Sequence, residues 1–145
     1  MSIIINVSNS LSHNIDLELL EKVIRTALEN HNKADTDLTL QITNDETIRQ
    51  LNHAYRDINE ATDVLAFNQD FINPETNQLY LGDIIISIDR ARVQALENNH
   101  TINKECALLT IHGTLHLLGY DHSNEQEKLE MWKIQDKILK DVMLL

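Results

Sequence analysis

Three histidines between residues 111 and 122 have the spacing of metal ligands. His112 and His116 are four residues apart, and His122 follows six residues later. On a helix, residues four apart project from the same side, one turn from each other. Gly119 comes three residues after His116, where it could adopt the left-handed conformation that ends a helix and turns the chain back. We therefore predict that all three histidines bind one metal ion.

The chemistry of this ligand set favours a catalytic zinc site. Three neutral imidazoles leave one position of a tetrahedral zinc ion open, which is typical of catalytic rather than structural zinc. Water bound to zinc can have a pKa of about 7, so a nucleophile would be available without a carboxylate base. We predict one Zn²⁺ per chain. Imidazoles also suit nickel, copper and iron, so the metal used in the cell stays open.

The same spacing of three histidines and a glycine occurs in metzincin proteases, where a glutamate directly after the first histidine is the general base. In this chain that position is Gly113. Without the carboxylate, a peptidase lacks the group that takes the proton from the attacking water. We therefore expect a metzincin-like zinc-site helix, and a metalloprotease-like hydrolase is kept only as an alternative.

Composition limits the remaining function classes. The 145 residues, 42% of them hydrophobic, predict a single domain over residues 1–145. The net charge of −11 argues against a general nucleic-acid binder, although the 12 basic residues could still form a local phosphate site. Cys106 is the only cysteine, which favours a reducing compartment. No segment approaches the roughly 18 apolar residues of a membrane span, so we expect a cytoplasmic protein with no membrane partner.

The hydrophobic pattern predicts an α+β fold, with a single mixed β-sheet of about four strands covered by about five helices. The predicted strands cover residues 2–7, 38–42, 63–67 and 83–88. The predicted helices follow the N-caps Asp16 and Asn44 and cover roughly 89–99, 104–118 and 125–141. Strands 2–7 and 83–88 are apolar enough to be buried, and residues 73–77 form the clearest turn.

Five blocks of residues match the pattern of one known family, in the family's order, over about residues 51–131. They are the run from His112 to His122, Leu51-Asn52 with Tyr55-Arg56, Thr62-Asp63-Val64-Leu65, the stretch from Leu81 to Ser87, and Met131. On these blocks the chain resembles the bacterial YbeY family of endoribonucleases. It departs from the family's usual Leu-Ser-Phe-Pro at Ala66 and Asn68, and Asn59 and Ala61 replace a common Asp and Pro.

The resemblance implies a single-strand-specific, zinc-dependent endoribonuclease that acts in 3′-end maturation of small-subunit ribosomal RNA and in ribosome quality control. It implies as partners single-stranded RNA, the small ribosomal subunit or its proteins, and a ribosome-associated GTPase. Two other functions stay open: a zinc hydrolase of another substrate class, and a non-catalytic ribosome-assembly factor with a structural zinc. The endoribonuclease is preferred, although the acidic charge gives the assembly factor some weight, because free RNA binding should be weak.

The catalytic residues that follow from this comparison are Arg56 and the ligand His116. The family match places Arg56 beside Thr62 and Asp63, where its guanidinium could stabilise charge that develops on a phosphodiester. The alternative is a solvated arginine at a helix end.

Other polar residues have simpler interpretations. Asp121 could accept a hydrogen bond from a ligand imidazole or cap the following helix. We expect a structural role for Asp83 and a packed position for Cys106. The remaining histidines lack partners at ligand spacing and are predicted to be solvated: His13, His31, His53 and His100. The lysines of the last helix alternate with acidic residues and predict a solvated face.

Overall fold

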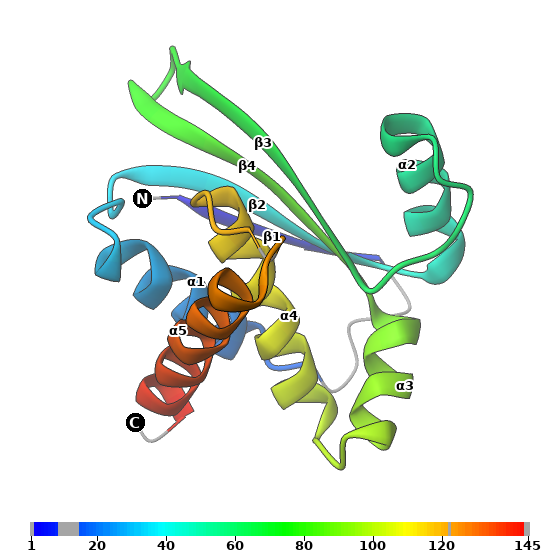
Figure 1. The fold of residues 1–145 in the computed structure, drawn as a ribbon. Helices are drawn as coiled ribbons and strands as arrows, with labels where there is room; N and C mark the ends of the chain where they lie inside the picture. Colours follow the sequence, from blue (N-terminus) through cyan, green and yellow to red (C-terminus); the bar gives the residue numbers. More distant parts are fainter. Residues whose placement is uncertain (1, 9–14, 122, 144–145) are drawn as a thin grey trace.

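The computed structural model describes residues 2–8, 15–121 and 123–143. It contains four strands and five helices, in agreement with the predicted α+β fold (Figure 1). The strands are β1 (Ile3–Val7), β2 (Thr36–Thr43), β3 (Val64–Asn73) and β4 (Gln78–Ser87). The helices are α1 (Leu17–Asn30), α2 (Asp45–Arg56), α3 (Ile88–Glu97), α4 (Ile102–Leu117) and α5 (Glu125–Met143). None of the helices in these ranges is long and apolar enough to cross a membrane.

The four strands form one mixed sheet in the order β1-β2-β4-β3. β1 pairs with β2 and β2 with β4 in parallel, while β3 and β4 form an antiparallel hairpin through the predicted turn at residues 74–77. Parallel neighbours require crossover connections, and α1 supplies the one between β1 and β2. β3 therefore lies at one edge of the sheet, which is important for the site described below.

The two faces of the sheet carry different helices. α1, α4 and α5 cover one face and α2 packs on the other (Figure 1). Because side chains alternate along a strand, Leu38, Leu40 and Ile42 of β2 lie in the core with α1 and α4, whereas Thr39 and Gln41 lie on the α2 face. On that second face a smaller apolar cluster joins Ile48 of α2 to the strands.

The predicted N-caps are confirmed. The side chain of Asp16 accepts a hydrogen bond from the Leu19 N–H at 3.1 Å, and that of Asn44 accepts one from the Thr47 N–H at 2.9 Å. Each cap satisfies a backbone donor that the first turn of its helix leaves unpaired.

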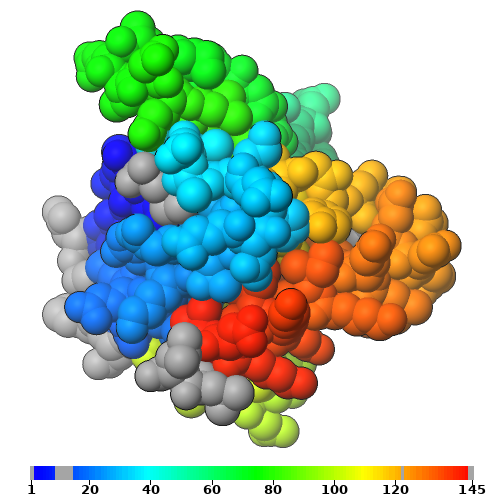
Figure 2. All heavy atoms as spheres, turned by 90° about the vertical axis from the view of Figure 1, so that its left-hand side faces the viewer, coloured from blue at the N-terminus to red at the C-terminus, as the bar shows by residue number. Residues whose placement is uncertain are grey.

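Three strand predictions need correction. β1, predicted to be a buried strand, is only half-buried, because it is an edge strand whose residues alternate in exposure, and Ile4 is 52% exposed. β4 begins at Gln78 rather than at residue 83, and β3 does not end at residue 67 but continues to Asn73. Its polar second half is held by pairing with β4 rather than by burial. This end of the hairpin, shown in green, stands out from the rest of the surface in Figure 2.

Candidate active site

The helix α4 positions two of the three predicted metal ligands. His112 and His116 lie one turn apart on it, with ring centroids 4.8 Å apart and an interplanar angle of 67°. The helix is otherwise almost entirely buried, and the hydroxyls of Thr110 and Thr114 donate to the carbonyl oxygens of Cys106 and Thr110 within the helix. Its buried surroundings therefore fix the direction in which both imidazoles point.

Gly113 allows α4 to approach β4 closely. A Cβ atom built at this position would lie 2.6 Å from Cγ2 of Ile84, a fully buried residue. Such a distance is a severe steric overlap, so a side chain at residue 113 would require the helix or the strand to move. The position that holds the catalytic glutamate of a metzincin therefore has no room for one here.

A small pocket of about 240 Å³ brings the two histidines together with residues from distant segments. His112 and His116 line it from α4, Val64 and Ala66 from β3, and Arg56 from the end of α2. The sequence match placed Arg56 near the segment 62–63, and the structure confirms this proximity, since Thr62 and Asp63 line the same pocket.

Arg56 reaches the pocket by lying against the edge strand β3. It is the last residue of α2, which ends at Asp57 in the left-handed conformation with a φ of 59°. Its Nη2 atom donates to the carbonyl oxygen of Ala66 at 3.3 Å, and its guanidinium carbon lies 5.6 Å from the centre of the Phe67 ring. Both contacts restrict the long side chain. A fully solvated arginine would have neither contact.

Asp63 is a pocket residue to which the sequence reasoning assigned no role. Its carboxylate accepts hydrogen bonds from the Val64 N–H at 2.8 Å and from Nε2 of Gln94 at 3.2 Å. These bonds hold the carboxylate at the start of β3, beside the histidines. In the sequence, the feature that points to Asp63 is its place in the block Thr62-Asp63-Val64-Leu65, which supports the family resemblance.

The third predicted ligand, His122, lies outside the described residues. In the part of the chain that the structure describes, no group of three or more His, Cys, Asp or Glu is placed to hold a metal ion. The turn that leads toward His122 has the predicted form: Gly119 has a φ of 104°, and the Tyr120 N–H donates to the carbonyl oxygen of Leu115 at 3.0 Å. Hydrogen bonds of this kind commonly close a helix that ends in a left-handed glycine.

Two histidines predicted to be solvated are instead partnered. Nδ1 of His31 lies 2.7 Å from the carbonyl oxygen of Ala27, so this nitrogen must be the donor. Nε2 of the neutral ring then accepts from the hydroxyl of Tyr120 at 2.8 Å. His100 pairs with the buried Glu105 at 3.0 Å. Tyr120 is 89 residues from His31 in sequence, and Glu105 is five residues from His100. The search for histidines at ligand spacing could therefore reveal neither partner.

The other predictions for single residues can now be compared with the structure. His53 is exposed as expected, and His13 lies outside the described residues. Cys106 is fully buried as predicted, and burial raises the pKa of its thiol to about 11. Asp121 is exposed and does not cap α5, because Asn124 accepts from the Glu127 N–H at 2.9 Å.

Comparison with known proteins agrees with these observations. The family model described as endoribonuclease YbeY matches residues 5–143. A protein named endoribonuclease YbeY from Heliobacterium modesticaldum is 43% identical over 74% of this chain and 70% of its own length. Another of that name, from Agathobacter rectalis, is 37% identical over 96% of both chains. The solution structure of TM1509 from Thermotoga maritima superimposes with a TM-score of 0.63 at 27% identity, covering 97% of this chain and 88% of that one. The chain therefore belongs to the YbeY family of endoribonucleases.

Proposed function

We propose that this protein is a zinc-dependent endoribonuclease, specific for single-stranded RNA, that acts in 3′-end maturation of small-subunit ribosomal RNA and in ribosome quality control. The observation that carries the proposal is the shared pocket of Arg56, His112 and His116 on a chain of this family. A nitrogen donor pair and a guanidinium side by side match the needs of phosphodiester hydrolysis.

The donor set is compatible with zinc. His112 and His116 would hold the ion, and His122 is proposed as the third ligand because it follows the helix-ending turn at Gly119. Two imidazoles on consecutive turns of one helix are an arrangement that zinc accepts. A zinc ion held there supplies Lewis acidity, which makes water a competent nucleophile near neutral pH.

Arg56 is proposed to stabilise the charge that develops on the phosphate. Its Nη2 atom is engaged with the Ala66 carbonyl, but a guanidinium has five N–H donors, so others remain for a phosphate oxygen. The backbone contact and the Phe67 ring hold the guanidinium in place before substrate arrives. Less conformational entropy is therefore lost when substrate binds. His116 lines the same pocket as Arg56 and is proposed to act in the same reaction as a metal ligand.

Ribosomal partners would explain how so acidic a protein reaches RNA. A net charge of −11 weakens association with free RNA, because few phosphates are neutralised. We propose that the small subunit or its proteins, together with a ribosome-associated GTPase, deliver the RNA end to the pocket. The proposed compartment is the cytoplasm, where a buried, unpaired cysteine such as Cys106 stays reduced.

The alternative of a metalloprotease finds no support in the site. Gly113 occupies the position of the catalytic glutamate and its Cβ would overlap Ile84, so the general base is missing and cannot be introduced without movement. The remaining alternative, a non-catalytic assembly factor with structural zinc, is separated from an enzyme by experiment.

The experiment compares zinc-loaded wild type with His116→Ala on single-stranded RNA, double-stranded RNA and casein. His53→Ala is the matched control, because His53 is exposed on α2 and lies outside the pocket. We expect wild type and control to cut only single-stranded RNA, and His116→Ala to lose both zinc and cleavage. Equal cleavage by wild type and His116→Ala would show that the activity is a contaminant. Zinc binding without any cleavage of ribosomal precursor RNA would favour the assembly factor.

A further inference from the structure

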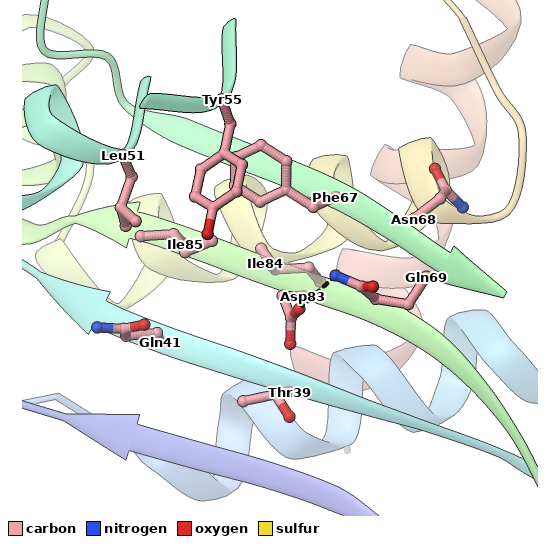
Figure 3. A pocket seen from close by; sticks show the side chains of 10 residues that line it. All are labelled: Thr39, Gln41, Leu51, Tyr55, Phe67, Asn68, Gln69, Asp83, Ile84 and Ile85. Atoms are coloured by element: carbon pink, nitrogen blue, oxygen red, sulfur yellow. Dashed lines mark hydrogen bonds between the residues drawn. The ribbon is translucent and has the colours of Figure 1, made fainter. Parts of the chain in front are cut away.

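A second, larger pocket lies on the opposite face of the sheet from α4. It has a volume of about 480 Å³, which is within the range of small-molecule sites. Tyr55 of α2 and Phe67 of β3 form one wall, with ring centroids 5.3 Å apart, and polar side chains of β2, β3 and β4 form the floor (Figure 3). These polar residues are Thr39, Gln41, Gln69 and Asp83.

The two pockets share β3 as a common wall. Successive residues of a strand point to opposite faces, so Ala66 lines the pocket of the histidines while Phe67 lines the larger pocket. Arg56 spans this edge strand, because its guanidinium contacts the Ala66 carbonyl and lies over the Phe67 ring. If Arg56 holds a phosphate of the RNA, the nucleoside next to that phosphate would therefore be able to reach the larger pocket.

The chemistry of the larger pocket selects against a phosphate and for a flat, neutral group. None of its lining residues is a lysine or an arginine, and its only charged residue is Asp83. Tyr55 is 70% exposed, so its ring presents an aromatic surface on which a ligand can stack. Aromatic rings beside amide and hydroxyl groups are how single-stranded nucleic acids are commonly bound.

Asp83 gives the pocket a preference among flat groups. One carboxylate oxygen accepts from the hydroxyl of Tyr80 at 2.5 Å, and the other from Nε2 of Gln69 at 3.2 Å. Burial and the first of these bonds raise the pKa of Tyr80 to about 12, so this hydroxyl remains a donor. A carboxylate has about four acceptor positions, so two remain for a ligand. Two adjacent N–H donors on one planar edge would match them.

We propose that this pocket binds a guanine base of the RNA strand whose phosphate lies at Arg56. Guanine presents N1–H and the 2-amino group side by side on its Watson–Crick edge, whereas adenine, cytosine and uracil each present donors from only one nitrogen there. The base stacks on Tyr55 and its edge pairs with Asp83. This inference rests on the proposed endoribonuclease function and adds a base preference next to the cleaved bond.

The first test measures nucleotide binding without cleavage. The probes are guanosine and adenosine 5′-monophosphate, and the readout is the NMR signals of the side-chain amides of Gln41 and Gln69. We expect the guanine nucleotide to shift these signals at concentrations about tenfold lower than the adenine nucleotide, the size of one bidentate contact. Asp83→Asn should remove the difference. Asp70→Asn is the matched control, since it removes the same charge from an exposed position of β3 outside the pocket.

The second test uses cleavage of short single-stranded oligonucleotides that carry one guanine at varied positions. Tyr55→Ala should raise KM about tenfold, the loss of one stacked base, with a smaller change in kcat. Trp132→Ala, which removes an exposed aromatic ring from α5, should leave both constants unchanged.

The outcomes separate the two proposals. If the wild type cleaves RNA but neither nucleotide shifts the two amides, or if Tyr55→Ala behaves like Trp132→Ala, the guanine pocket is refuted and the endoribonuclease proposal is unaffected. If the guanine nucleotide binds selectively but zinc-loaded wild type cleaves no RNA, the proposed function fails and the nucleotide site is supported.

Discussion

The Nη2 atom of Arg56 lies 3.3 Å from the carbonyl oxygen of Ala66, so the end of α2 is attached to the edge strand of the sheet. This contact places a guanidinium from one face of the sheet at a pocket on the other. Because the acceptor is the backbone carbonyl of residue 66, this hydrogen bond does not need the serine side chain that the family commonly has there. The departure at Ala66 therefore leaves the position of Arg56 intact.

Arg56→Ala should retain zinc and lose cleavage. We expect a decrease in kcat of about a hundredfold, which is typical for the loss of one donor to transition-state charge. Zinc content by elemental analysis should match the wild type, since Arg56 is no ligand. Arg25→Ala, at an exposed ion pair with Glu21 on α1, is the control. Full activity of Arg56→Ala would mean that Arg56 is only a surface charge.

Gly113→Ala should destabilise the protein by about 1 to 3 kcal/mol, because the new methyl group overlaps Ile84 and a packed core tolerates extra volume poorly. Urea denaturation of metal-free protein measures this free energy of unfolding directly. In an Ile84→Ala background the same substitution should cost much less, since the atom it meets at 2.6 Å has been removed. Equal costs in both backgrounds would contradict the close approach of α4 and β4.

Tyr120→Phe should weaken zinc binding, although Tyr120 is not one of the proposed ligands. The lost hydroxyl donates to His31, the residue that follows α1, and holds the segment between α4 and His122. Because Tyr120 acts through the backbone of this segment and not through a hydrogen bond to a ligand, we expect a loss of affinity of about 10-fold, the lower end of the range for groups bonded directly to metal ligands. Competition with a fluorescent zinc chelator gives the affinity, and Tyr80→Phe controls for the loss of a phenol elsewhere. An unchanged affinity would show that the hydrogen bond has no part in positioning the site.

The burial of Cys106 predicts that the free energy of unfolding decreases in alkali. Its pKa is raised from 9.0 to about 11 in the folded protein, mainly by burial, so the unfolded chain loses the thiol proton first. The free energy of unfolding is unaffected below pH 9 and should fall by up to about 3 kcal/mol as the pH rises from 9 to 11. Cys106→Ala should flatten this part of the profile in chemical denaturation. A slope between about pH 10 and pH 12 would remain in this variant, because the pKa of Tyr80 is raised from 10.0 to about 12.

Much of the fold could be predicted from local patterns. Apolar residues at strand and helix spacing located every element, and the caps Asp16 and Asn44 and the turn at residues 74–77 are confirmed because their chemistry acts within a few residues. The errors at β1, at the end of β3 and at the start of β4 have one cause. Whether a strand lies at an edge or is held by its partner depends on pairing with distant residues.

The same distinction holds for the site. The spacing of His112 and His116 was enough to predict that they face one pocket, because a helix alone determines which residues share a side. The positions of Arg56 and Asp63 beside them depend on how α2 and β3 pack around the sheet. The two-residue period of a strand predicts that Ala66 and Phe67 point to opposite faces, but which pocket each of them lines depends on the pairing of β3 with β4 and on the helices that cover each face. Short-range geometry is set by the covalent chain, whereas contacts between distant segments exist only once the whole core has packed, and this is why the second pocket could be found only in the folded molecule.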